Sequence, residues 1–232
     1  MPNHVKWLGH AACQITTGTG KVILVDPWIT GNPACTIKKE DITRADIILV
    51  THDHSDHLGL DIPDLVKATG ATVIAQPELV AAIQASGVSP GNILFGMGMN
   101  IGGQVEVAGI KVTMTQAHHS STAGDPVGYI IILEDGKTVY HAGDTGIFAS
   151  MGLLGTLYTI DLALLPIGSV FVMDPLQAAH SLTLLKPKKA VPIHYGTFPI
   201  LVQSADEFIR LAAEKAPDVM VEAIRPGQEV FI

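Results

Sequence analysis

A short segment of the chain concentrates residues that bind metal ions. It reads THDHSDHL over residues 51–58 and carries His52, His54, Asp56 and His57, with no thiolate among them. Imidazole and carboxylate groups are ligands that Zn²⁺, Mn²⁺, Fe²⁺ and Ni²⁺ accept. Residues two apart in extended chain project to the same side, so His52 and His54 can hold one ion. A turn after them would bring Asp56 and His57 to a second ion, and the spacing therefore predicts a metal site.

The position of this segment supports the same interpretation. It directly follows the apolar run 47–50, which is typical of a strand buried on both faces. Ligand-binding loops lie at the carboxyl ends of such strands. The alternative is a loop of solvated polar residues, but this order of histidines and aspartate arises by chance in roughly one chain in a thousand. We therefore favour the metal site.

The elements that must position these residues follow from hydrophobic patterning. Short apolar runs between turn residues predict strands, and apolar residues at helical spacing predict helices. Strands are expected at residues 5–8, 13–16, 21–26, 47–50, 73–75, 106–107, 110–115, 127–133, 138–140, 162–165, 190–193 and 219–223. Helices are expected at residues 62–68, 78–85, 174–185 and 204–215. Asp174 followed by Pro175 is a favourable start for the third helix.

The order of these elements predicts the architecture. Strands precede alternating strands and helices in both halves, so we expect an α/β fold with two similar βα halves. Their sheets would pack face to face with helices outside, as a four-layer αββα sandwich. A chain of 232 residues is long enough to bury such a core, and we expect residues 1–232 to form a single domain.

Composition narrows the class of protein. Hydrophobic residues make up 47% and charged residues 16% of the chain, which excludes disorder. No apolar stretch reaches the roughly 18 residues that a membrane span requires, so no membrane association is expected. The formal net charge of −8 disfavours nucleic acid, which is bound through clustered lysine and arginine. A small-molecule substrate is the expected partner, and the low charge content is compatible with a homo-oligomeric interface.

The cysteines and the N-terminal residues bear on location. Cys13 and Cys35 are too few for a disulfide framework, which favours a reducing compartment. The first residues, MPNHVKW, lack the basic and apolar regions of a secretory signal. We therefore expect a cytoplasmic protein.

Five segments together resemble the metallo-β-lactamase superfamily of metal-dependent hydrolases. They span nearly the whole chain and read ILVDPW (23–28), THDHSDHLG (51–59), TQAHHSS (115–121), HAGDT (141–145) and PIHYGTFP (192–199). The last two are most similar to a small bacterial branch of metal-dependent hydrolases related to the ascorbate-phosphate lactonases. The resemblance implies an αββα sandwich with a dinuclear site at its edge, as the order of elements predicts independently.

The resemblance also implies a set of metal ligands. One ion would be bound by His52, His54 and His119, the other by Asp56, His57 and His194, and Asp144 would bridge the two. The segment 115–121 offers both His118 and His119, and the small residue that follows favours His119. His118 would then line the pocket or contact a ligand.

Three more residues are expected near the ligands. Asp26 ends a strand that points to the same edge, where it would orient a histidine ligand or, alternatively, form a turn. His10 would line the pocket or serve as a hydrogen-bonded structural histidine. Tyr195 follows a ligand and would donate to a substrate oxygen or simply pack.

The chemistry implied is hydrolysis at two divalent ions, with Zn²⁺ or Mn²⁺ as first candidates and Fe²⁺ or Ni²⁺ as others. A metal ion lowers the pKa of water from 15.7 to about 7, so a hydroxide bridging the ions can attack at neutral pH. Asp56 would orient this nucleophile and accept its proton. The expected substrate is a small ester, lactone, amide or phosphoester. The alternative is a catalytically silent metal-binding or regulatory protein on the same fold.

The resemblance leaves the substrate pocket undefined. In the segment PIGSVFVMDP (166–175), Val172 stands where the branch often has a polar residue, and Ser169 stands near the place of an acidic residue or glycine. The sequence motifs therefore do not predict which substrate the pocket prefers.

Overall fold

The computed structural model describes residues 2–232, in which the strands form two mixed sheets. The first sheet has the strand order β13-β1-β2-β3-β4-β5 and the second the order β12-β11-β10-β9-β8-β7-β6. The first contains β1 His4–Gly9, β2 Ala12–Thr16, β3 Val22–Val25, β4 Ile47–Leu49, β5 Thr72–Ile74 and β13 Glu229–Phe231. The second contains β6 Gln104–Val107, β7 Ile110–Gln116, β8 Val127–Ile132, β9 Thr138–His141, β10 Leu162–Pro166, β11 Lys189–Ile193 and β12 Met220–Val221.

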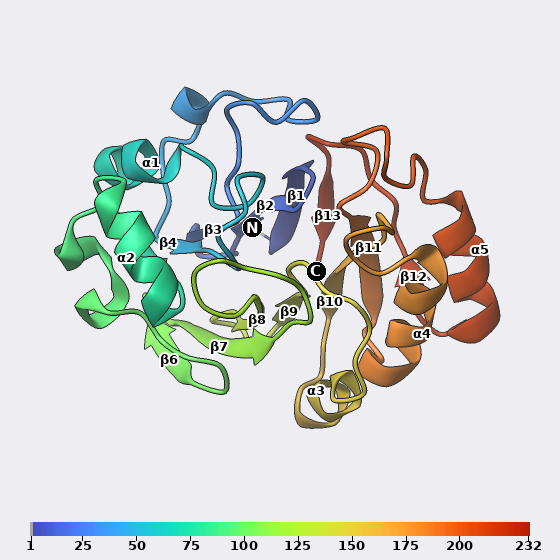
Figure 1. The fold of residues 1–232 in the computed structure, drawn as a ribbon. Helices are drawn as coiled ribbons and strands as arrows, with labels where there is room; N and C mark the ends of the chain where they lie inside the picture. Colours follow the sequence, from blue (N-terminus) through green and yellow to red (C-terminus); the bar gives the residue numbers. More distant parts are fainter. Residues whose placement is uncertain (1) are drawn as a thin grey trace.

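Helices cover the outer faces of the two sheets. They are α1 Ile62–Thr69, α2 Pro77–Ala85, α3 Met151–Leu157, α4 Pro175–Leu185 and α5 Asp206–Lys215. Short 3₁₀ turns lie at Lys39–Asp41, Pro90–Asn92 and Leu94–Gly96. In Figure 1, α1 and α2 flank the strands on the left, α4 and α5 flank them on the right, and α3 lies below.

Three apolar layers hold these elements together. Ile15 of β2 and Val112 of β7 belong to the layer between the sheets. Leu65 of α1 belongs to the layer outside the first sheet, and Phe208 of α5 to the layer outside the second. The structure is therefore the four-layer αββα sandwich that the sequence predicts.

The continuous apolar sequence of β3 shows why the layers form. Ile23 and Val25 face the layer between the sheets, while Val22 and Leu24 face the layer under α1 and α2. Successive side chains of a strand point to opposite faces, and both faces of this strand are covered. The whole run is therefore apolar, and polar residues begin only where the strand ends.

Parallel pairing brings several strand ends to the same edge. In the first sheet β3, β4 and β5 run parallel, and in the second sheet β9, β10 and β11 do so. The carboxyl ends of parallel strands meet at one edge of a sheet. The loops that follow these strands are therefore placed to build a common site.

Helix starts follow the predicted capping signals. The Asp174 side chain accepts a hydrogen bond from the Gln177 backbone N–H at 2.7 Å, which caps α4 ahead of Pro175. Pro77 occupies the first turn of α2, where its missing N–H has no cost.

Two elements differ from the expectation. Helix α3 has the sequence MGLLGTL, whose glycines weaken the helical signal, and it forms where Met151 is buried against the second sheet. Strand β13 follows the second half in sequence but pairs antiparallel with β1 of the first sheet, Val230 opposite Val5. The end of the chain therefore completes the first sheet with a strand that the hydrophobic pattern did not predict.

Within residues 2–232, no helix combines the length and the apolar character needed to cross a membrane.

Candidate metal centre

Four loops bring the predicted ligands to one edge of the sandwich. The loop after β4 carries the HxHxDH segment, and the loop after β7 carries His119. Asp144 lies after β9 and His194 directly after β11. Residues far apart in the chain thus converge, and their ligand atoms fall into three overlapping groups in which all atoms lie within 4.8 Å of one another.

The first group consists of His52, His54 and His119. Nδ1 of His54 lies 3.0 Å from Nε2 of His52 and 3.2 Å from Nε2 of His119. Three imidazole nitrogens that face one another at such distances present their lone pairs to a common point. This is the arrangement that one metal ion bound by three histidines requires.

The second and third groups share a histidine. One contains His10, Asp56, His57 and His194, and the other contains His52, His57 and Asp144. Oδ2 of Asp144 lies 3.0 Å from Nε2 of His194, 3.2 Å from Nε2 of His57 and 3.6 Å from Nε2 of His119. Asp144 therefore lies between the groups, where the resemblance implies a bridging carboxylate.

Asp26 orients ligands on both sides of this arrangement. Its Oδ2 atom accepts a hydrogen bond from Nδ1 of His57 at 2.8 Å and from the Thr51 hydroxyl at 2.7 Å. The Thr51 oxygen, having donated its hydrogen to Asp26, accepts from Nδ1 of His52 at 2.9 Å. Both rings therefore turn Nε2 toward the centre, which is how carboxylates typically support histidine ligands.

Backbone conformations at the centre are unusual. Asp26, His10 and His194 adopt positive φ angles of 46°, 56° and 56°. Aspartate and histidine enter this left-handed region more readily than most residues, yet it remains costly and clusters at functional sites. Gly168 supports one of these residues, since a Cβ there would lie 2.2 Å from the His194 carbonyl oxygen.

Burial and neighbouring charges set the protonation of the cluster. Burial lowers the pKa of His52 to about 3, so this ring is neutral at neutral pH, the form that binds metal ions. Burial disfavours a charged Asp144, but His194 and His57 beside it hold its pKa well below the ordinary range. Burial also opposes a charge on His57, but Asp144 and Asp26 raise its pKa well above the ordinary value.

The residues present fit divalent metal ions. Within the described part of the chain, Nε2 of His57 and Oδ1 of Asp144 are buried at the centre without a hydrogen-bond partner. Buried polar atoms are normally satisfied, so these atoms need partners that the polypeptide does not supply. Histidine and carboxylate donors suit Zn²⁺, Mn²⁺, Fe²⁺ or Ni²⁺.

His10 lies inside the cluster rather than at its border. Its ring centroid is 3.8 Å from that of His194, and its Nε2 atom lies 3.1 Å from Oδ2 of Asp56. Burial lowers the pKa of His10 to about 4, against the opposing effect of the Asp56 hydrogen bond. A neutral His10 can therefore donate to Asp56 and hold this carboxylate in place.

Two other predicted residues lie away from the ligand groups. His118 is exposed, and its ring stacks on Phe148 at 5.1 Å with an interplanar angle of 13°. Tyr195 is half-buried and stacks on Trp7 at 5.2 Å, which is the packing alternative for this residue.

A cavity of about 310 Å³ opens onto the cluster. Its lining includes five of the predicted ligands together with Ser120, Phe171 and Phe198. The two phenylalanines were not among the residues singled out from the sequence. Phe198 lies in the PIHYGTFP segment, and Phe171 in the segment whose departure from the related branch left the pocket undefined.

Comparisons with known sequences agree with this geometry. A family profile described as "Beta-lactamase superfamily domain" matches residues 21–195. A "UPF0173 metal-dependent hydrolase" from Nitratidesulfovibrio vulgaris (strain DP4) is 48% identical over 232 residues, covering 100% of this chain and 96% of that protein. Another from Pyrobaculum islandicum is 45% identical over 231 residues, covering 98% of this chain and 99% of that protein.

Solved structures give the same result. A novel metallo hydrolase from the hyperthermophilic archaeon Ignicoccus hospitalis has a TM-score of 0.89 and 37% sequence identity, covering 100% of this chain and 99% of its own. An isothiocyanate hydrolase from Delia radicum gut bacteria has a TM-score of 0.76 over 98% of both chains. At 18% identity, the second likeness shows the fold alone.

The fold and the histidine-rich site define a metal-dependent hydrolase of the metallo-β-lactamase superfamily. Within this class, the chain belongs to the UPF0173 metal-dependent hydrolase family.

Proposed function

We propose that the protein hydrolyses a small ester, lactone, amide or phosphoester at a site of two divalent metal ions. One observation carries this proposal: histidine and aspartate side chains from four separate loops converge at one sheet edge, and Asp144 joins their groups. Burying ionisable groups together costs free energy unless they are paired or bind a metal ion, and such clusters are typical of functional sites.

The ligand assignment follows the groups. His52, His54 and His119 would hold one ion, Asp56, His57 and His194 the other, and Asp144 would contact both. Bound Zn²⁺ or Mn²⁺ would lower the pKa of a water molecule and polarise the substrate oxygen. The remaining work of binding, orienting and moving protons falls to the side chains of the chain.

Asp56 is placed for proton handling. It lines the cavity, and its side chain is 27% exposed. Its Oδ2 atom accepts a hydrogen bond from Nε2 of His10. Burial disfavours its charge, but this hydrogen bond keeps the pKa of Asp56 below its ordinary range. Hydrolysis adds the oxygen of water to the carbonyl carbon or phosphorus, breaks the bond to the leaving group and transfers a proton to it. Asp56 can orient the water and carry that proton.

The size of the cavity supports a small substrate. A volume of about 310 Å³ suits a molecule of roughly metabolite size rather than a polymer. A cytoplasmic location, and a lactone as one member of the substrate class, belong to the same proposal.

The test combines metal content with turnover. The purified protein, loaded with Zn²⁺ or Mn²⁺, is assayed against a panel of nitrophenyl esters, lactones, anilides and phosphodiesters. We expect turnover of one chemical class, loss of activity with a chelator and recovery when metal is returned. His54→Ala and Asp144→Asn should lose both bound metal and turnover.

Two results would overturn the proposal in different ways. Full metal content and unchanged turnover in both variants would show that these residues are not the site. Bound metal without turnover of any class, in a folded protein, would favour the catalytically silent metal-binding alternative.

A further inference from the structure

Two aromatic side chains flank the cavity that opens onto the metal ligands. Phe171, in the loop between β10 and α4, has 54% of its surface exposed, and Phe198, in the loop after β11, is half-buried. Both line the same cavity as Asp56, His119 and Asp144. A hydrocarbon surface therefore lies next to the place where a bond would be cleaved.

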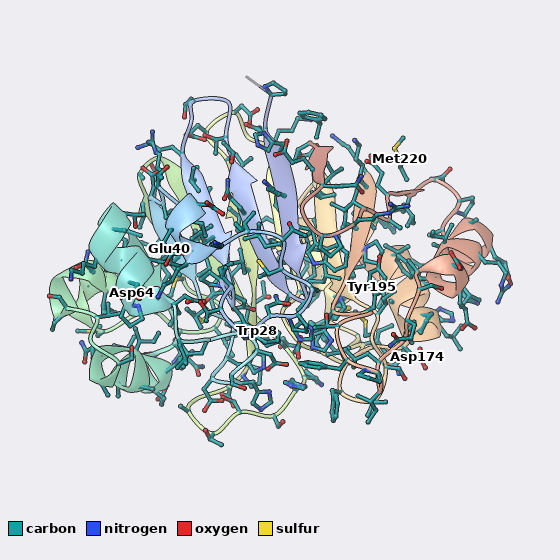
Figure 2. All side chains as sticks on the ribbon, turned by 90° about the horizontal axis from the view of Figure 1, so that it is seen from above. Trp28, Glu40, Asp64, Asp174, Tyr195 and Met220 are labelled. Carbon is teal, nitrogen blue, oxygen red and sulfur yellow. The ribbon has the colours of Figure 1, made fainter. Side chains whose placement is uncertain are left out.

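Phe198 is supported from behind. The ring of Trp28 stacks on it at 6.1 Å with an interplanar angle of 26°, and the His10 ring meets it edge-on at 5.5 Å. Trp28 itself is only 9% exposed, and Figure 2 places it near the ends of the central strands. Phe198 is thus a fixed wall of the cavity rather than a loose surface side chain.

Phe171 is held outward by its backbone. Ser169 and Val170 before it adopt positive φ angles of 62° and 54°, and for a β-branched valine this is a genuine outlier. The loop is tied at both ends, by Met173 N–H to the Thr145 carbonyl and by Val202 N–H to the Gly168 carbonyl, each at 2.9 Å.

This backbone strain has a local consequence. It keeps Phe171 and the neighbouring Val170, 62% exposed, on the surface although both are apolar. Strain of this kind persists only where surrounding structure enforces it, and it points to a function. The backbone of Phe171 also contacts the His119 imidazole, so the loop joins this apolar surface to a predicted ligand.

Across residues 2–232, the cavity offers no cationic side chain to a charged group on the tail of a substrate. Among the described residues that line it, none is a lysine or arginine, and the ionisable groups are Asp56, Asp144 and the histidine ligands. Away from the predicted metal ligands, an anionic tail would meet Phe171, Phe198 and Ser120 and no cationic side chain of the described residues. This part of the lining therefore matches a neutral tail.

We propose that Phe171 and Phe198 form an apolar mouth that binds the hydrocarbon part of an uncharged ester or amide, so that Phe171 determines substrate preference. This inference rests on the proposed hydrolase function and names its substrate class. Full burial of a methylene group would raise kcat/KM about fourfold. Because the mouth contacts only one side of a growing alkyl chain, we expect an increase of about two- to fourfold per methylene.

The experiment uses metal-loaded protein and a series of 4-nitrophenyl esters. Acetate, butyrate and hexanoate vary the chain length, and the hydrogen adipate ester adds a terminal carboxylate to a chain like that of hexanoate. We expect kcat/KM to rise along the neutral series and to fall at least tenfold from hexanoate to hydrogen adipate. Phe171→Ala should flatten the chain-length dependence, and Phe171→Leu should retain most of it. Leu153→Ala, an exposed leucine of α3, is the matched control and should behave as wild type.

The outcomes separate this inference from the proposed function. Three results would overturn the inference without contradicting the proposed hydrolase function. Turnover does not depend on chain length, turnover favours the carboxylate ester, or Phe171→Ala keeps the chain-length dependence of the wild type. Absence of all turnover would overturn the proposed function instead.

Saturation-transfer NMR with hexanamide tests binding at the apolar mouth without any turnover. Saturation transfer to the terminal methyl group in wild type, and its loss in Phe171→Ala, would support the inference. Absence of transfer in wild type would refute it.

Discussion

Asp26 holds His57 through a buried contact, with Oδ2 of the carboxylate 2.8 Å from Nδ1 of the ring and both side chains inaccessible to solvent. The same oxygen accepts a hydrogen bond from the Thr51 hydroxyl, whose oxygen in turn accepts one from Nδ1 of His52. A single carboxylate therefore orients His57 directly and His52 through Thr51, and the proposed assignment gives these two imidazoles to different metal ions. Its removal should affect both halves of the site at once.

Replacing Asp26 with alanine is expected to weaken metal binding about 10- to 100-fold, because His57 and His52 lose the acceptor that orients their rings. Metal analysis after dialysis and competition with a chelating dye measure the change. Asp218→Asn removes an exposed carboxylate elsewhere and should bind metal as wild type does. Wild-type affinity in a folded Asp26→Ala protein would contradict the role assigned to this residue.

The adjacent histidines of the loop after β7 should behave differently. Nε2 of His119 lies 3.2 Å from Nδ1 of His54, whereas His118 is exposed and stacks on Phe148. His119→Ala should therefore lower metal affinity at least tenfold, since losing one donor of a three-histidine set removes a direct bond. His118→Ala, which removes the same side chain one residue earlier, should leave metal content within experimental error. Equal losses in the two variants would show that the ligand assignment in this loop is wrong.

Gly168 allows the chain to pass close to His194. A Cβ at this position would lie 2.2 Å from the His194 carbonyl oxygen and 3.0 Å from its Nδ1. Gly168→Ala should cost about 1–3 kcal/mol of unfolding free energy through overpacking, and it should lower metal content by displacing a ligand.

The matched control for Gly168 is a glycine with space around it. At Gly152 in α3 a Cβ would meet nothing nearer than 3.9 Å, so Gly152→Ala should stabilise the protein by roughly 0.5–1 kcal/mol. Thermal and denaturant unfolding measure both effects. A Gly168→Ala protein as stable and as metal-rich as wild type would contradict the close approach described here.

Metal binding should release a proton from His57. Its pKa is raised well above the ordinary value by Asp144 and Asp26, against the effect of burial, so in protein stripped of metal the ring is protonated at neutral pH. A metal ion at Nε2 must displace that proton, and we expect about one proton to be released as this ligand binds.

The sign of the pH dependence follows from this competition. A proton competes better as pH falls, so apparent metal affinity should decrease by about tenfold per pH unit below the raised pKa. Calorimetric titrations in buffers with different ionisation enthalpies measure the released proton directly. Identical binding enthalpies in all buffers would contradict a protonated His57.

Local features of the sequence account for the elements and for most of the candidate site. Continuous apolar runs such as Ile47–Leu49 mark strands covered on both faces, and polar residues that bind metal begin where the run ends. The sequence also predicts the Asp174 cap, because the residue that it caps is only three positions away in the chain. The sequence does not predict helix α3, because its glycine-rich segment forms a helix only through packing against the second sheet.

Taken by itself, the sequence determined which residue types are available for chemistry and on which strand ends they lie, since these depend on spacing within a few residues. Only the tertiary structure decided that His119 rather than His118 faces His54, because neighbouring side chains in a loop point in directions that the loop's anchoring sets. It also decided that β13 completes the first sheet and that Phe171 stands beside the ligands. These are contacts between residues distant in the chain, and their energies arise only when the layers pack.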